Sequence, residues 1–255
     1  MRAVAKLAKR AARAETGLFL VEGPQALREA LAFHPELLVE VFAVRGVFDR
    51  HPELGRGLAA AGLEAELVSD AVLEAMADTV TPQGVVAVAR QFPVTIKDLL
   101  AQGSRLIAIL EEVRDPGNAG TIIRAADAAG ADGVILTGKS VDAYNPKVVR
   151  STTGSIFHLP LAQGGTLEHA LRLVQAAGMQ VFAADISGEE LPTLRDRLPE
   201  PTAWLFGNEA HGLGEEQLAL ADRAVRVPIY GHAESMNLAT AASVCLYQSA
   251  FAQRS

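Results

Sequence analysis

Apolar residues follow two different patterns along the chain. In the N-terminal part, short apolar runs predict four strands, at residues 17–22, 37–45, 65–69 and 85–90. Helical spacing predicts three helices between them, at residues 23–33, 55–62 and 71–78, with Asp70 as the cap of the third. We expect a compact α/β unit without a catalytic constellation. Its most conspicuous polar pair, Glu22 and Gly23, fits a turn as well as a ligand contact.

From Leu106 onwards the apolar runs become more regular. Strands are predicted at residues 106–110, 133–137, 179–185, 203–207 and 224–229. Helices are predicted at residues 119–132, 145–155, 166–178 and 214–222, and from Met236 or Asn237 onwards. Near-continuous apolar strands that alternate with helices indicate a parallel sheet covered on both faces. Such sheets bind ligands at the carboxyl ends of their strands.

The stretch between the two patterns is punctuated by Pro93 and Gly103 and contains one short helical piece. We therefore divide the chain into an N-terminal domain at 1–92, a linker at 93–104 and a C-terminal domain at 105–255.

The bulk composition is that of an ordinary globular protein, with 255 residues of which 49% are hydrophobic and 21% charged. No apolar run approaches the ~20 residues that span a bilayer, so no membrane partner is expected. The basic N-terminus lacks the apolar core of a secretory signal. A single cysteine, Cys245, excludes an intramolecular disulfide and a multi-cysteine zinc site. We expect a cytoplasmic protein in which Cys245 packs in the core.

The net charge of −7 argues against indiscriminate binding of nucleic acid, although the distribution of charge decides the matter. Five basic residues precede the first acidic one, Glu15, and these are Arg2, Lys6, Lys9, Arg10 and Arg13. They form either a solvated helix face or an arm that contacts phosphates.

Clusters of polar residues occur in three loops that follow predicted strands. In the first, Asn118 and Arg124 are either a helix cap and a surface residue or ligands of a phosphate or hydroxyl group. In the second, Glu209 follows a buried strand beside three glycines, at 207, 212 and 214. The third, at 230–237, leads from an apolar run into a helix.

Several familiar site types are absent. The chain has no GxGxxG, P-loop or GxSxG motif, which disfavours dinucleotide, nucleoside triphosphate and serine hydrolase sites. A hydrolase that uses Ser235 and His232 would also lack a clear acid partner. None of the six histidines forms an HxH or HxxxH pair, so no metal site is expected.

Taken together, the three loops resemble a known family. Residues 118–136, 205–213 and 227–247 resemble, in order and spacing, the three motifs of the SpoU/TrmH family of RNA ribose 2′-O-methyltransferases. The resemblance covers roughly residues 102–255, and residues 19–31 resemble the ribosomal-protein-like α/β RNA-binding domain of many members. It implies a sheet threaded as a trefoil knot, a homodimer whose site takes residues from both subunits, and S-adenosyl-L-methionine as cofactor.

The resemblance also implies roles for individual residues. Methyl transfer to a ribose hydroxyl requires in-line geometry and removal of a proton from a weak acid. Arg124 would act at the 2′-oxygen and its neighbouring phosphate, by orientation and electrostatic stabilisation because an arginine is a poor general base. Asn118 and Glu209 would position the nucleotide and Arg124, and Ser235 and Asn237 would fix the loop and the substrate. Backbone groups would bind the cofactor around Thr137, Gly138, Gly207, Val227, Ile229 and Met236.

Ribosomal RNA is the expected substrate because of the appended N-terminal domain, which would share with the basic arm the attraction of phosphates. Transfer RNA is the nearest alternative. A catalytically silent RNA-binding or ribosome-assembly protein is another, although such a protein need not retain the five predicted catalytic residues. The sequence leaves open the modified nucleotide, the proton acceptor, a housekeeping or antibiotic-resistance role, and whether His232 covers the loop or touches substrate.

Overall fold

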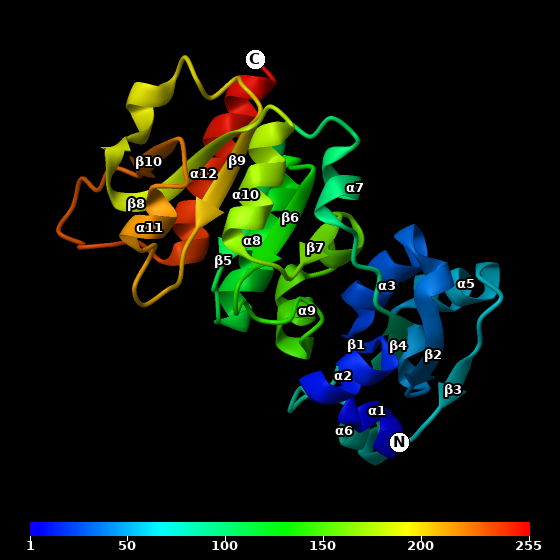
Figure 1. The fold of residues 1–255 in the computed structure, drawn as a ribbon. Helices are drawn as coiled ribbons and strands as arrows, with labels where there is room; N and C mark the ends of the chain where they lie inside the picture. Colours follow the sequence, from blue (N-terminus) through cyan, green and yellow to red (C-terminus); the bar gives the residue numbers. More distant parts are fainter. The chain divides into compact units, whose positions relative to one another are not determined.

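The computed structural model describes residues 1–255, which form two compact units (Figure 1). Unit 1 comprises Met1–Phe92 together with Asp142–His158, and unit 2 comprises Pro93–Val141 together with Leu159–Ser255. The division expected from sequence placed residues 142–158 in the C-terminal domain, whereas in the structure they pack with the N-terminal one. Helical periodicity shows that this segment has an apolar face, but not which core receives it.

Unit 1 is built on a four-stranded sheet in the order β1-β4-β2-β3. Its strands, all four of them predicted, are β1 (Leu18–Glu22), β2 (Leu38–Ala43), β3 (Ala65–Leu67) and β4 (Val85–Arg90). Strand β4 pairs antiparallel with β1 and β2, and β3 pairs parallel with β2. The helices are α1 (Arg2–Lys6), α2 (Arg10–Thr16), α3 (Pro24–Phe33), η1 (Pro35–Leu37), α4 (Gly46–Arg50), α5 (Pro52–Ala60), α6 (Asp70–Met76), α9 (Pro146–Thr152) and η2 (Ser155–Phe157).

One predicted helix cap is wrong. Ser69, not Asp70, caps α6, because the Ser69 hydroxyl accepts a hydrogen bond from the backbone N–H of Val72 at 3.4 Å. Ser69 has extended backbone angles, and Asp70 is the first helical residue. A negative charge is also favourable in the first turn of a helix. Either residue could therefore be the cap as far as the sequence shows.

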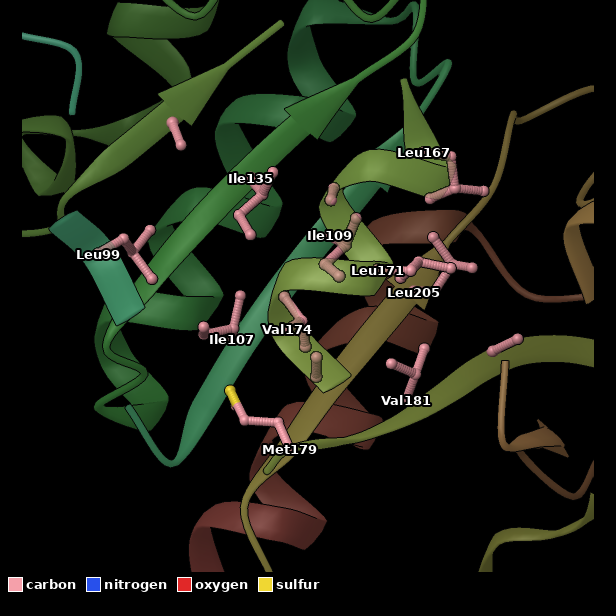
Figure 2. Close-up of a cluster of buried hydrophobic side chains, with 14 of the residues drawn as sticks. Leu99, Ile107, Ile109, Ile135, Leu167, Leu171, Val174, Met179, Val181 and Leu205 are labelled. Carbon is pink, nitrogen blue, oxygen red and sulfur yellow. The ribbon is translucent and has the colours of Figure 1, made fainter. Parts of the chain in front are cut away.

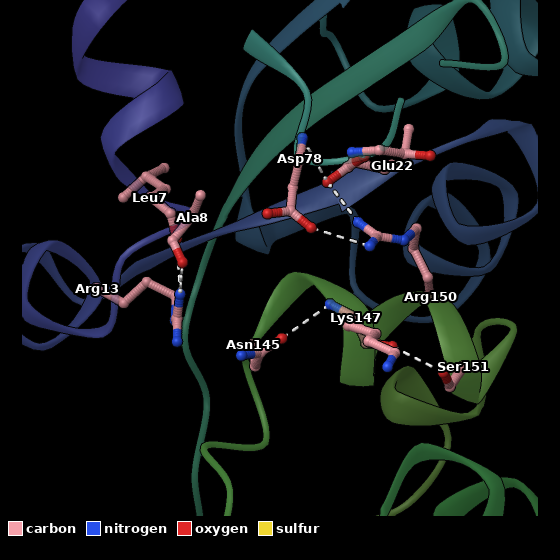
Figure 3. A network of polar contacts seen from close by, with 10 residues as sticks. Leu7, Ala8, Arg13, Glu22, Asp78, Asn145, Lys147, Arg150 and Ser151 are labelled. Atoms are coloured by element: carbon pink, nitrogen blue, oxygen red, sulfur yellow. Dashed lines mark hydrogen bonds and ion pairs between the residues drawn. The ribbon is translucent and has the colours of Figure 1, made fainter. Parts of the chain in front are cut away.

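Arg13 departs from the other basic residues of the N-terminus. Its side chain is only 2% exposed and pairs with Asp142, with Nη2 at 2.6 Å from the carboxylate and Nε donating at 2.7 Å. Figure 3 shows the same guanidinium donating to the backbone of the Leu7–Ala8 turn. Arg13 therefore holds segment 142–158 in unit 1 and is not part of a phosphate-binding arm. Four basic residues of the expected arm remain exposed, Arg2, Lys6, Lys9 and Arg10.

Aromatic side chains complete the attachment of this segment. Phe157 stacks on Phe92 with a centroid distance of 5.9 Å, and Tyr144 lies 4.9 Å from Phe19. The Tyr144 hydroxyl accepts a hydrogen bond from the backbone N–H of Phe92 at 3.0 Å. Burial raises the pKa of this hydroxyl, so Tyr144 stays neutral in the core.

Unit 2 contains a six-stranded sheet in which every pairing is parallel, in the order β10-β8-β9-β5-β6-β7. The strands are β5 (Leu106–Glu111), β6 (Gly133–Thr137), β7 (Leu161–Gln163), β8 (Gln180–Glu190), β9 (Thr202–Phe206) and β10 (Arg223–Arg226). The helices are α7 (Ile96–Leu100), α8 (Pro116–Ala129), α10 (Leu167–Ala176), η3 (Leu191–Leu194), α11 (Glu215–Leu218) and α12 (Leu238–Gln253). The predicted parallel sheet is confirmed, and only the short edge strand β7 was not anticipated.

Helices cover both faces of this sheet, as expected for continuous apolar strands. On one face, Figure 2 shows Leu171 and Val174 of α10 packed over Ile107 and Ile109 of β5. Leu99 of α7 belongs to the same cluster, so the expected linker is part of this core.

On the other face, the indole of Trp204 donates a hydrogen bond to the Ser249 hydroxyl of α12 at 2.9 Å. Cys245 of α12 is fully buried, and burial raises its pKa to about 12. Its predicted place in the core is confirmed.

The sheet register determines where the loops lie. Leu110 is paired with both Leu136 and Phe206, and Ala183 is paired with Leu205. The carboxyl ends of β5, β6 and β9, and the point where β8 leaves its regular pairing, therefore fall at one level of the sheet.

The Arg13–Asp142 pair gives a stability prediction. In Asp142→Asn a buried guanidinium loses its counter-ion, and we expect the free energy of unfolding to fall by roughly 3–5 kcal/mol in urea denaturation followed by circular dichroism. The double variant Arg13→Met with Asp142→Leu should recover most of this loss. A loss below about 1 kcal/mol would show that the pair acts only as a surface ion pair does.

Candidate functional site

The first loop of unit 2 ends in a well-capped helix. The Asp115 carboxylate accepts a hydrogen bond from the backbone N–H of Asn118 at 2.8 Å, and Pro116 occupies the first helical position of α8. Asn118 therefore lies inside the first turn and is not the cap. Its side-chain amide is available for contacts with other loops.

Glu209, from the loop after β9, connects to this helix start. Its carboxylate accepts hydrogen bonds from the backbone N–H groups of Arg114 at 3.1 Å and Asp115 at 2.9 Å. The Asn118 side chain donates to the same carboxylate at 3.4 Å. Hydrogen bonds to an ionised acceptor are stronger than neutral ones, so Glu209 fixes the two loops to each other.

Asn237 brings in the third loop. Its Nδ2 donates to Oδ1 of Asn118 at 3.0 Å, while its own Oδ1 accepts from the backbone N–H of Ala239 at 2.9 Å and caps α12. The structure thus brings together three predicted catalytic residues from three distant stretches of the chain. We call Asn118, Glu209 and Asn237 the loop network.

The loop that carries Glu209 is tightly folded. Asn208 and Gly212 exchange two backbone hydrogen bonds, and the Asn208 side chain donates to the carbonyl of Glu112 at 2.8 Å. A Cβ on Gly207 would lie 2.6 Å from the backbone of Gly212. Position 207 therefore accepts only glycine.

A cavity of about 490 Å³ opens beside the loop network. Seven predicted site residues line it, namely Asn118, Glu209, Ser235, Asn237, Val227, Ile229 and Met236. Apolar and polar side chains both line it, and its volume is usual for small-molecule sites.

Other predicted site residues lie outside this cavity. Thr137 is fully buried and its hydroxyl donates to the Glu111 carboxylate, while Gly138 is exposed with a φ of 60°. Gly207 lies behind the Asn208 turn. Arg124 is exposed on α8, one and a half turns beyond Asn118, and His232 is exposed in the third loop. Their roles stay predictions.

Asp185 and His211 are among the lining residues that the sequence did not predict. Asp185 follows the regular part of β8, where the pairing jumps from Ala183–Ala224 to Glu189–Val225. One carboxylate oxygen of Asp185 accepts from the Ser187 backbone at 2.9 Å and hydroxyl at 2.7 Å. His211, from the Glu209 loop, also lines the cavity. An acidic residue at the end of an apolar parallel strand was the signal available for Asp185.

Glu111 lies at the end of β5, next to this site. Glu111 as a residue is 6% exposed, and its carboxylate accepts hydrogen bonds from Thr137 and from the Gln217 side chain, the latter at 3.1 Å. Loss of solvent raises the pKa of Glu111, and the hydrogen bond from Thr137 opposes that rise.

No set of three or more His, Cys, Asp or Glu side chains is placed to hold a metal ion. None of the helices is long and apolar enough to cross a bilayer.

Comparison with known proteins identifies the class. The model of the SpoU rRNA methylase family matches residues 105–247, more than half of the chain, and the chain belongs to this family. A second model, described as RNA 2′-O ribose methyltransferase substrate binding, matches residues 20–95.

Individual relatives agree along nearly the whole length. The 23S rRNA (guanosine(2553)-2′-O)-methyltransferase RlmP of Bacillus subtilis is 33% identical over 95% of this chain and 92% of its own. An AdoMet-bound rRNA methyltransferase from Sinorhizobium meliloti has a TM-score of 0.81 and 31% identity, covering 97% of this chain and 92% of that one. The SpoU methyltransferase AviRb from Streptomyces viridochromogenes, in complex with the cofactor AdoMet, has a TM-score of 0.83 and 30% identity. The match covers 99% of this chain and 97% of that one.

The raised pKa of Glu111 gives a pH prediction. Below its unfolded pKa of 4.5 the carboxyl is neutral in both states, and as pH rises through the higher folded pKa the buried charge destabilises the fold. Glu111→Gln has no charge to bury and does not suffer this loss. We therefore expect the melting temperature of the variant to rise relative to that of the wild type between about pH 4 and pH 8. A difference that is constant over this range would assign Glu111 an ordinary pKa.

Proposed function

We propose that this protein transfers the methyl group of S-adenosyl-L-methionine to the ribose 2′-hydroxyl of one nucleotide in ribosomal RNA. It is an S-adenosyl-L-methionine-dependent RNA methyltransferase of the SpoU family. The observation that carries the proposal is the loop network, which lines a cavity together with apolar residues. The choice of ribosomal RNA rests on relatives named as 23S rRNA methyltransferases.

The residues around the cavity fit this cofactor. Val227, Ile229 and Met236 provide an apolar wall for the adenine and the methionine chain. Asp185 has a second carboxylate oxygen without a protein hydrogen bond, which suits a hydroxyl or ammonium group of the cofactor. The bound cofactor supplies an electrophilic methyl group on a sulfonium. Thr137, Gly138 and Gly207 belong to the same proposal through their backbone groups.

The loop network would orient the ribose. The Asn237 amide donates a hydrogen bond to Asn118, and the Asn118 amide donates one to Glu209. These side chains are therefore fixed before substrate arrives. Preorganised groups of this kind lower the barrier because little reorganisation remains during the reaction. Ser235, exposed at the cavity mouth, would contact the substrate side. Arg124 would stabilise charge at the 2′-oxygen, and the proton acceptor is left open.

Arg124 does not line the cavity of its own chain, and this supports a homodimer in which each site is completed by the partner. Helix α12 offers a surface for such pairing, because Phe251 is 61% exposed and lies 5.5 Å from the Tyr247 ring. The family resemblance supports the same dimer and a trefoil knot in the C-terminal part. A ribosomal RNA substrate would place the enzyme in the cytoplasm.

The N-terminal domain would bind the RNA. The substrate-binding family model matches residues 20–95, and the exposed residues Arg2, Lys6, Lys9 and Arg10 add positive charge next to it. Transfer RNA is the alternative substrate. A catalytically silent assembly protein is disfavoured, since such a protein would not need the loop network.

Arg124→Ala tests the catalytic assignment. We expect methyl transfer to ribosomal RNA to fall by about a hundredfold or more, because a charge-stabilising group is lost at the reacting oxygen. Calorimetry should show unchanged affinity for S-adenosyl-L-methionine, and loss of that affinity would move Arg124 to the cofactor pocket. Arg172→Ala, an exposed change on α10, is the charge-matched control.

Mixed subunits test whether Arg124 acts across the dimer. Co-refolded Arg124→Ala and Asn237→Ala chains form heterodimers with one intact site if Arg124 serves the partner's cavity. About a quarter of wild-type activity should then return. No return of activity in verified heterodimers would place Arg124 and Asn237 in the same subunit's site.

The basic arm can be tested without disturbing Arg13. In Lys9→Gln with Arg10→Gln, we expect the slope of log Kd for RNA against log salt concentration to become shallower by about 1–2, because phosphate contacts are lost. The control is Arg172→Gln with Arg195→Gln, which removes the same charge from exposed positions of unit 2. Equal slopes in both variants would leave the arm as a solvated helix face.

A further inference from the structure

A second cavity, of about 350 Å³, lies entirely within unit 1, where β1 ends. We call it the Glu22 cavity; it is formed by Glu22 and Gly23, the start of α3, the loop at 79–83 and part of segment 142–158. Gly23 has a φ of 92°, and a Cβ there would lie 3.0 Å from Oε1 of Gln83. Glycine at this position therefore leaves room for the Gln83 amide. The volume is in the range of ligand sites.

The wall of this cavity is held in place by a charge cluster around the buried Glu22 (Figure 3). The Glu22 carboxylate, whose side chain is 3% exposed, accepts hydrogen bonds from Arg150 at 3.0 Å and from the backbone N–H groups of Asp78 and Thr79 at 3.2 Å. Arg150 also pairs with Asp78 at 2.9 Å. Glu22 is thus fully occupied in bracing the loop and is not itself the ligand-binding group.

Three polar side chains of the cavity make no hydrogen bond within the protein, the amide of Gln83 and the hydroxyls of Thr79 and Thr81. The cavity is also lined by apolar residues, Val85 and Val86 among them. An amide offers two donors and an acceptor in one plane. Proteins recognise an unstacked nucleobase by hydrogen bonds to its edges, and a side-chain amide can form such bonds.

A positive charge stands next to this amide. A neighbouring cavity shares Gln25 and Gln83 with the first and is also lined by Arg50. Arg28 and His51 in that cavity both pair with Glu53, at 2.5 and 3.6 Å. Arg50 has no carboxylate partner and donates only to the carbonyl of Gly46, at 3.2 Å. Its guanidinium is therefore available to bind a phosphate.

We propose that the Glu22 cavity and Arg50 bind one unpaired nucleotide of the substrate RNA, with the base against Gln83 and the phosphate against Arg50. The cavity belongs to unit 1 and the loop network to unit 2, and the proposal takes this nucleotide to be a different one from the methylated nucleotide. It would supply sequence selection that methyl transfer itself does not require. The inference rests on the proposed function in taking RNA as the substrate.

RNA binding by filter retention tests the site without requiring methyl transfer. Arg50→Ala and Gln83→Ala should each weaken the Kd for ribosomal RNA by about tenfold, since each removes a charge-assisted or base-edge contact. Arg56→Ala, an exposed change on α5 that lines neither cavity, is the matched control and should stay within about twofold. Circular dichroism melting and calorimetry with S-adenosyl-L-methionine should match the wild type in all three.

Ultraviolet cross-linking gives a second, independent measurement. We expect mass spectrometry to place a cross-linked nucleotide on the peptide around residues 79–83, and to find it lost in Gln83→Ala. The proposal is overturned if neither variant weakens RNA binding beyond the control. It is also overturned if nucleoside monophosphates bind at Gln83 while RNA affinity is unaffected, which would make this a site for a free nucleotide. Failure of the wild type to methylate RNA would count against the proposed function alone.

Discussion

The site of unit 2 depends on the hydrogen bonds that the Glu209 carboxylate accepts. This carboxylate accepts hydrogen bonds from the backbone N–H groups of Arg114 and Asp115 and from the Asn118 amide, and Asn118 in turn accepts from Asn237 at the start of α12. One ionised side chain therefore fixes three loops that are distant in sequence. Charge-assisted hydrogen bonds are roughly twice as strong as neutral ones, which suits a network whose task is to hold geometry. This network and apolar residues of the chain that follows β10 line the same cavity.

Segment 142–158 performs a comparable task in unit 1. The chain leaves the parallel sheet after β6, contributes α9 to the N-terminal core, and returns at β7. Two charge pairs attach it, Arg13 with Asp142 and Arg150 with Glu22, and the second also braces the wall of the Glu22 cavity. The same short segment thus follows the strand that ends at Thr137 and supports the nucleotide site that we propose. The chain itself thus passes from unit 2 to unit 1 and back through this segment.

Local patterns predicted the elements well because apolar periodicity and helix caps act over a few residues. All the strands proposed from sequence are present, and the parallel sheet followed from their continuous apolar character. The cap of α6 was misplaced because Ser69 and Asp70 are both good cap residues, and backbone angles decide between them. The loops that carry the site were found for a similar reason, since polar residues directly after buried strands have few structural explanations.

The sequence by itself determined the fold class, the family resemblance and seven of the residues that line the cavity. Tertiary structure decided which of them meet. Asn118, Glu209 and Asn237 form one network because the parallel register brings their strand ends to the same level, and no local pattern contains that register. Arg13 was expected on the surface with its basic neighbours, but its partner Asp142 lies 129 residues away. A buried charge is stabilised only by a partner that folding brings to it, so its role is settled by long-range contacts.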